Sequence, residues 1–207
     1  MRGEIMKKSL FCLICCILLA FSSTGLAAET TGPYVSVNLG WAMMADGNVS
    51  GVDNHGPFSE ELEYDSGLTF GGALGNNFGN GRIEGEVAYQ TNDIDTISGV
   101  KTDNYETSLL SFMVNGYYDF HNDSAFTPYL TAGIGVAKFE LEPTGQPKED
   151  DTVFAYQFGF GGEYAVSETV SLDCRYRYLG IADAELENKD EFEVASHNIT
   201  LGVRVAF

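Results

Sequence analysis

Large apolar residues alternate with small or polar residues through most of the chain after about residue 30. The alternation is clearest in residues 196–207, where every second residue from 199 onward is large and apolar (Ile199, Leu201, Val203, Val205, Phe207). A period of two is typical of a β-strand with one apolar face. The same pattern predicts eight strands, at residues 34–44, 67–78, 82–90, 105–120, 127–139, 153–164, 170–179 and 196–207.

The connections between these segments are long and short in turn. Residues 45–66, 91–104, 140–151 and 180–193 are long, polar and mostly acidic, whereas residues 79–81, 121–125 and 166–169 are short. This order is expected of an up-and-down barrel with extended loops at one end and tight turns at the other. Strands of about ten residues also have the length that a tilted strand needs to cross a bilayer.

The strand faces opposite the apolar ones indicate which solvent surrounds the barrel. They carry glycine and charged side chains where a soluble sandwich would need its apolar core. The charged residues on these faces are Arg82, Glu84, Glu86, Asp119, Glu163, Asp173, Arg175, Arg177 and Arg204. An apolar outside with a polar inside is stable in lipid rather than in water. The pattern therefore predicts an all-β fold, an eight-stranded antiparallel up-and-down transmembrane β-barrel, closed by pairing of residues 196–207 with residues 34–44.

The N-terminal residues fit a secretory signal peptide. Basic residues (Arg2, Lys7, Lys8) precede an apolar run at 9–21, which is too short to cross a bilayer as a helix, and small residues follow at Ala27 and Ala28. We therefore expect a signal peptide at 1–28 and a barrel domain at 29–207. A retained membrane anchor and a lipoprotein signal are the alternatives.

Cysteine and charge limit the chemistry of the remaining chain. Three of the four cysteines lie in the predicted signal peptide, so Cys174 alone is left, and neither an internal disulfide nor a cysteine-based metal site is expected. The full chain has a net charge of −19, and residues 29–207, with 8 basic and 29 acidic residues, have a net charge near −21. Such an excess repels nucleic acid and anionic lipid surfaces, whereas it attracts divalent cations and basic partners.

Several short motifs in this order resemble the small outer-membrane β-barrel family, which includes the membrane domain of outer membrane protein A and the opacity-type, porin-like surface proteins. The motifs are Asn115-Gly116-Tyr117-Tyr118-Asp119-Phe120, Thr127-Pro128-Tyr129, Gly133-Ile134-Gly135-Val136, Gly159-Phe160-Gly161-Gly162-Glu163-Tyr164, Tyr176-Arg177-Tyr178 and Thr200-Leu201-Gly202-Val203-Arg204 with Phe207. They cover essentially all of residues 29–207. The sequence departs from the family in its unusually acidic loops.

The resemblance implies a location and partners. The protein is expected in the outer membrane of a Gram-negative bacterium, with long extracellular loops, short periplasmic turns, and lipid and lipopolysaccharide around it. Val203, Val205 and Phe207 would form the C-terminal signal for the barrel assembly machinery. No peptidoglycan-binding domain follows Phe207, so anchoring to the cell wall is not expected.

The inward charges have two interpretations, a structural plug or a channel lining. An eight-stranded barrel is about wide enough for its side chains to fill, and arginine pairs with carboxylates through two parallel hydrogen bonds, so the plug is favoured. The acidic loops offer weak metal candidates at Asp150, Asp151, Asp183, Glu185 and Glu187. Their spacing is not that of an EF-hand, and a solvated acidic surface is the preferred interpretation.

A catalytic pair is the third possibility, because Ser196 and His197 are adjacent near the loop end of the last strand. Adjacent strand residues point to opposite faces, so these two cannot act directly as nucleophile and base. We therefore expect a non-enzymatic outer-membrane barrel without a cofactor, with a structural or surface-exposed role such as that of a surface antigen, and with a host ligand or divalent cations as loop partners. A narrow porin-like channel is the first alternative, and a lipid-modifying barrel enzyme is the second.

Overall fold

The computed structural model describes residues 31–45, 47–53, 56–97, 100–101, 105–143, 148–182, 184–185, 191–192 and 194–207. The predicted signal peptide at 1–28 lies outside these residues. Within the described ranges, no helix is both long and apolar enough to cross a membrane.

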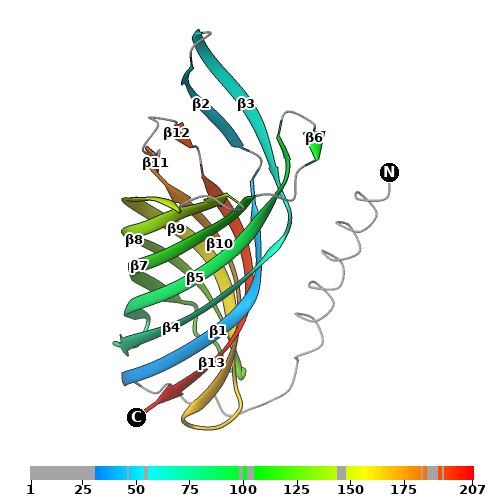
Figure 1. The fold of residues 1–207 in the computed structure, drawn as a ribbon. Coiled ribbons are helices and arrows are strands. Elements are labelled where there is room, and N and C mark those ends of the chain that lie inside the picture. The colour runs from blue at the N-terminus through cyan, green and yellow to red at the C-terminus, as the bar shows by residue number, and fades with distance from the viewer. Residues whose placement is uncertain are drawn as a thin grey trace.

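Eight long strands form one closed antiparallel barrel (Figure 1). They are β1 (Gly32–Met44), β4 (Gly67–Asn77), β5 (Gly81–Ile97), β7 (Tyr105–Asp119), β8 (Phe126–Pro143), β9 (Glu149–Ala165), β10 (Val170–Ile181) and β13 (Ala195–Ala206). Each strand pairs with the next, and β13 pairs with β1 from Tyr34↔Ala206 to Met44↔Ser196. The predicted barrel and its closing pair are confirmed.

The strand registers fix the shear of the barrel. A path through directly paired residues leaves β1 at residue 43 and returns to it at residue 33, a shift of 43 − 33 = 10 residues (Met43, His197, Tyr178, Phe158, Ala132, Gly116, Ile83, Asn76, Pro33). Eight strands with this shear are tilted by roughly 40° from the barrel axis. On a neighbouring strand, the residue at the same height along the barrel axis therefore lies about 1.25 positions away from the directly paired residue.

The connections predicted to be long contain regular structure. Strands β5, β8 and β9 continue several residues past their predicted ends, and β2 (Gly47–Asp53) and β3 (Gly56–Tyr64) form a hairpin above the barrel (Figure 1). The short strands β6 (Val100–Lys101), β11 (Ala184–Glu185) and β12 (Glu191–Phe192) lie at the same end. The sequence left open whether these connections are ordered, and the structure shows that backbone pairing continues beyond the segments in which the apolar alternation is visible.

The outer wall carries the predicted apolar band. Leu39, Phe70, Val114, Ile134 and Leu201 are examples of large side chains that are more than half exposed on this wall. Such exposure would be unfavourable in water and is favourable in hydrocarbon. Cys174 lies on the same wall and is half-buried, as expected for a small apolar residue.

The polarity of the wall reverses where the strands leave this band. On β8, Ile134 and Val136 point outward within the band, whereas the next outward residues are Lys138 and Glu140, and Phe139 between them is fully buried. Phe139 belongs to an apolar mouth cluster inside the loop end of the barrel, formed by Met44, Ile94, Leu109, Met113, Ala137, Phe139, Leu141, Ala155, Leu179, Ile181 and Val194. The expectation of a polar lumen is wrong at this end, because strands surrounded by water need an apolar core.

Candidate functional site

The lower part of the lumen, toward the short turns, is organised around Arg82. Its guanidinium contacts Asp119 Oδ1 at 2.8 Å and Glu163 Oε2 at 3.3 Å. Glu163 in turn pairs through Oε1 with Arg204 Nη2 at 2.5 Å. The same guanidinium lies 4.4 Å from the ring centroid of Tyr117, a cation–π distance. Strands β5, β7, β9 and β13 are thus joined across the barrel interior.

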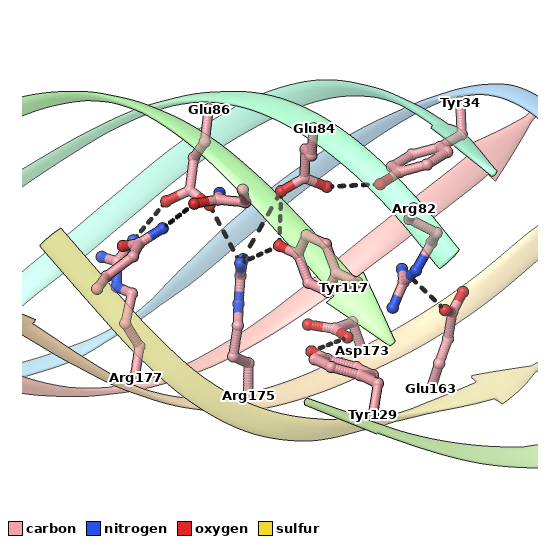
Figure 2. Close-up of polar contacts among 12 residues, drawn as sticks. Tyr34, Arg82, Glu84, Glu86, Tyr117, Tyr129, Glu163, Asp173, Arg175 and Arg177 are labelled. Atoms are coloured by element: carbon pink, nitrogen blue, oxygen red, sulfur yellow. Dashed lines mark hydrogen bonds and ion pairs between the residues drawn. The ribbon is translucent and has the colours of Figure 1, made fainter. Parts of the chain in front are cut away.

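A second group of charges lies closer to the middle of the barrel and is centred on Glu86 (Figure 2). Arg175 Nη1 contacts Glu86 Oε2 at 3.1 Å, and Arg177 Nη1 contacts the other carboxylate oxygen. Asn115 donates to Glu86 from its amide at 3.1 Å and accepts a hydrogen bond from Gln157. Asn115 and Gln157 were not among the predicted site residues, although their positions on inward faces could have identified them.

Three buried tyrosines connect the two groups of charges. Tyr34 and Tyr117 donate to the two oxygens of Glu84 at 3.0 and 2.7 Å (Figure 2). Tyr117 also accepts from Arg175 Nη1 at 2.7 Å. Tyr129 donates to Asp173 Oδ2 at 2.6 Å. All nine predicted lumen charges therefore lie in one continuous network, and the tyrosines, which sequence reasoning omitted, supply the donors that arginine alone does not.

The side chains of the network fill most of the lumen around them. Glu86 and Arg177 are each 2% exposed, so their charges are compensated by each other and not by bulk water. A cavity of about 20 Å³, with room for about one water molecule, lies among residues that include Asn38, Glu84 and Arg204. A larger cavity of about 120 Å³ lies at the short-turn end, beside Asp119 and Glu163.

A neutral polar layer and the mouth cluster cover the network on the loop side. Ser196 donates to Gln90 Oε1 at 3.2 Å, and Asn198 donates to the same oxygen at 3.3 Å. Asn92 donates from its amide to the carbonyl oxygens of Ala42 and Asp65, both at 2.9 Å. Above them lie the buried side chains of the mouth cluster. The lumen is therefore layered, with charges toward the short turns and apolar side chains at the loop end.

Among the described residues, the predicted metal candidates form no cluster that could hold a metal ion. Asp150 contacts Lys138 at 3.4 Å, and Asp151 accepts a hydrogen bond from the backbone N–H of Thr152. Glu185 lies on β11, while Asp183 and Glu187 lie outside the described residues. The described part of the chain contains no group of three or more acidic, histidine or cysteine side chains that could hold a metal ion.

Ser196 and His197 face opposite sides of β13. Ser196 is buried in the lumen beside Gln90, whereas Nδ1 of His197 bonds to the Tyr176 hydroxyl at 2.7 Å on the outer wall. At the other end of β13, the predicted assembly residues Val203, Val205 and Phe207 are exposed on the outer wall, and Phe207 donates its backbone N–H to Pro33.

Comparisons with known proteins identify the same architecture. A model of the outer membrane protein beta-barrel domain family matches residues 13–207. The chain is 32% identical over 122 residues to outer membrane protein PagN of Salmonella typhimurium, a match that covers 49% of this chain and 51% of PagN. It is 26% identical over 154 residues to major surface antigen 4 of Anaplasma marginale, covering 63% of this chain and 51% of that protein. The chain spans about half the length of the curated relatives it matches.

Solved structures show the same fold. Neisserial surface protein A superposes with a TM-score of 0.62 at 24% identity, covering 86% of this chain and 98% of that chain. OprG from Pseudomonas aeruginosa superposes with a TM-score of 0.58 at 16% identity, covering 88% of this chain and all of that chain. At these identities the likeness establishes the barrel fold alone.

Proposed function

The chain belongs to the outer membrane protein β-barrel domain family, and we propose that it is a non-enzymatic, non-conducting barrel that presents acidic elements at the cell surface. As a member of this family it resides in the outer membrane of a Gram-negative bacterium, within the lipid of that membrane. The proposal concerns what the barrel does there.

The mouth cluster is the observation that carries the proposal. Leu109, Phe139 and Leu179 are almost completely buried inside the loop end, where a water-filled pore would need polar walls. Below them, Glu86 is held between Arg175 and Arg177. An ion crossing the barrel would have to pass an apolar layer and then separate buried ion pairs, and both steps cost free energy.

Planar-bilayer conductance tests this proposal against the narrow-channel alternative. We expect the refolded protein to give no stable single-channel steps in a potassium chloride solution. The double variant Leu109→Ser/Phe139→Ser makes the mouth cluster polar and opens space within it. The matched control Val114→Ser/Phe112→Ser changes the outer wall of β7. Stable steps from the unmodified protein would contradict the proposal, and steps confined to the mouth-cluster variant would support it.

The surface role rests on charge. Exposed carboxylates occur on the outward side of the strand extensions, among them Asp93, Glu106, Glu142 and Asp150. A surface of this sign fits a basic host ligand or divalent cations, and calorimetric titration with calcium tests the latter. We also propose that Val203, Val205 and Phe207 guide β13 to the barrel assembly machinery. Pull-down of the machinery with a C-terminal peptide, compared with one lacking Phe207, tests that role.

The non-enzymatic character rests on the geometry at β13. Ser196 and His197 lie on opposite sides of the barrel wall, each bonded to another residue. Mass spectrometry of lipid A from cells that express the protein tests the lipid-modifying alternative. We expect identical lipid A with and without the protein, and a change that disappears in His197→Phe would contradict the proposal.

A further inference from the structure

A cavity at the short-turn end of the lumen lies beside the point where the chain enters the barrel. It has a volume of about 120 Å³, and Asn77, Asp119 and Glu163 are among the residues that line it. Asn77 is the direct strand partner of Gly32, the first residue of β1. His121, an exposed residue of the turn after β7, also lines the cavity, so water at this end of the barrel reaches it. We call this space the basal cavity.

The charges around the basal cavity do not balance. The nine lumen charges comprise four arginines and five carboxylates. Those nearest the basal cavity are three carboxylates and two arginines, namely Asp119, Glu163, Asp173, Arg82 and Arg204. Asp173 is the direct strand partner of Glu163 and accepts a hydrogen bond from Tyr129 at 2.6 Å (Figure 2). Among the described residues, it is the one lumen carboxylate without an arginine at ion-pair distance.

The excess negative charge requires a positive counterpart. Asp119 and Glu163 are 3% and 5% exposed, and a buried charge without a counterpart costs free energy. One small positive group in the basal cavity would restore the balance. A primary ammonium group suits the lining, because it has three N–H donors and no acceptor. The carboxylates and the hydroxyl groups of Thr127 and Ser171 supply acceptors around the cavity.

The chain itself provides an ammonium group at this place when the predicted signal peptide is removed. Cleavage after Ala28 makes the backbone nitrogen of Glu29 the new N-terminus, three residues before Gly32. Three residues span at most about 10 Å. Gly32 has a φ of +124°, a conformation that favours glycine, so the chain turns directly before β1. Residues 29 and 30 lie outside the described residues.

We propose that the basal cavity binds the α-ammonium group of the processed chain. The ammonium group donates hydrogen bonds to the carboxylates of Asp119 and Glu163, and its charge compensates that of Asp173. The Glu29 side chain stays in the water outside the cavity. Removal of the signal peptide thus supplies the charge that completes the lumen network. The proposal rests on the predicted signal peptide and is independent of whether the lumen conducts.

The reactivity of the N-terminus tests the proposal. The full-length gene is expressed in a Gram-negative host, and the processed protein is extracted from outer membranes in a neutral detergent. A trace of acetic anhydride near neutral pH acetylates the α-amino group, and mass spectrometry of the N-terminal peptide gives the rate. A charge-assisted hydrogen bond holds the group in its unreactive, protonated form. We therefore expect the folded protein to react about tenfold more slowly than the same protein unfolded in urea.

Two variants separate the basal cavity from general protection of the chain end. Asp173→Asn removes the excess negative charge, so the folded protein should react about tenfold faster than the unmodified one. The matched control is Asp123→Asn, which removes an exposed carboxylate from the turn after β7, and we expect it to keep the slow rate. Folding of both variants is checked by heat-modifiable migration on gels. If Asp173→Asn does not fold, acetylation of the unmodified protein before refolding decides the question, because it should lower the temperature of the gel shift.

The remaining outcomes would overturn the proposal. Equal rates in the folded and the unfolded protein would show that the α-amino group is free, as would an unchanged gel shift after acetylation. A slow rate that persists in Asp173→Asn would show that the excess charge does not hold the group. A rate that rises in potassium chloride, but not in choline chloride at equal ionic strength, would assign the basal cavity to an inorganic cation. A mass that still includes residues 1–28 would remove the proposed ligand.

Discussion

The Arg82 guanidinium and the Asp119 carboxylate meet inside the barrel at 2.8 Å, although 37 residues separate them in the chain. Both side chains are almost completely buried. The Arg82→Ala substitution would leave Asp119 and Glu163 without their shared partner. We expect the free energy of unfolding, measured by urea titration in lipid vesicles, to fall by about 3–5 kcal/mol.

An exposed ion pair provides the control for this experiment. Lys148 contacts Glu142 at 2.6 Å outside the barrel, and that hydrogen bond raises the pKa of the Lys148 ammonium. Water screens such a pair, so Lys148→Ala should leave the free energy of unfolding nearly unchanged. Equal losses in Arg82→Ala and Lys148→Ala would show that burial does not strengthen the lumen pairs.

Glu86 compensates two arginines at once. In Glu86→Gln, which keeps the size of the side chain, Arg175 and Arg177 would face each other without a carboxylate between them. Removing one partner of a buried pair costs about 3–5 kcal/mol, and repulsion between the two arginines adds to this. We expect Glu86→Gln to lower the temperature of the gel shift from folded to unfolded protein more than Arg177→Ala does. Unchanged melting in both variants would argue against a structural plug.

Phe139 tests the mouth cluster. Its side chain is fully buried, so Phe139→Ala creates a cavity and should lower the free energy of unfolding by about 3–5 kcal/mol. The control is Phe112→Ala on the outer wall, where lipid can refill the space that the ring leaves. Urea titration in vesicles compares the two. A loss in Phe112→Ala as large as that in Phe139→Ala would mean that the mouth cluster is not a packed core.

Two glycines on the barrel wall should respond differently to the same substitution. A Cβ atom at Gly40 would lie 2.0 Å from the backbone oxygen of Ile199, whereas one at Gly85 would have nothing within 4 Å. Gly40→Ala therefore forces β1 and β13 apart and should cost about 1–3 kcal/mol. We expect a smaller folded fraction for Gly40→Ala on refolding, and an unchanged fraction for Gly85→Ala. Equal yields would place the close approach of these strands in doubt.

The barrel and most of its inward charges could be predicted from sequence because both follow from a period of two. Side chains on a strand alternate between the two faces, so Arg204 must point inward once Leu201 is assigned to the outer face. The same alternation, applied within their own strands, orients Arg175, Arg177 and Glu86 inward. This alternation also places Tyr117 and Tyr129 in the lumen. Which residues meet there depends on the registers, and a shear of 10 residues cannot be deduced from any one strand.

The mouth cluster was not predicted, because the alternation of side chains along a strand does not show where the strand leaves the lipid. Residues 130–141 alternate throughout, but the apolar face points outward at Ile134 and inward at Phe139. The exchange occurs where the strand passes from lipid into water, so the same backbone pattern buries opposite faces on the two sides of that boundary. A sequence signal does exist, since the outward series changes from Val136 to Lys138 and Glu140.

The pairing of β1 with β13 also means that the barrel can close only after the whole chain has been made. The first strand to leave the ribosome obtains its second neighbour only when the last strand of the chain is present. Until then β1 and β10 each keep an open hydrogen-bonding edge, a template for pairing with other chains. These edges must therefore be kept from other chains until β13 is in place, and a chain that ends before residue 195 lacks the strand that closes the barrel.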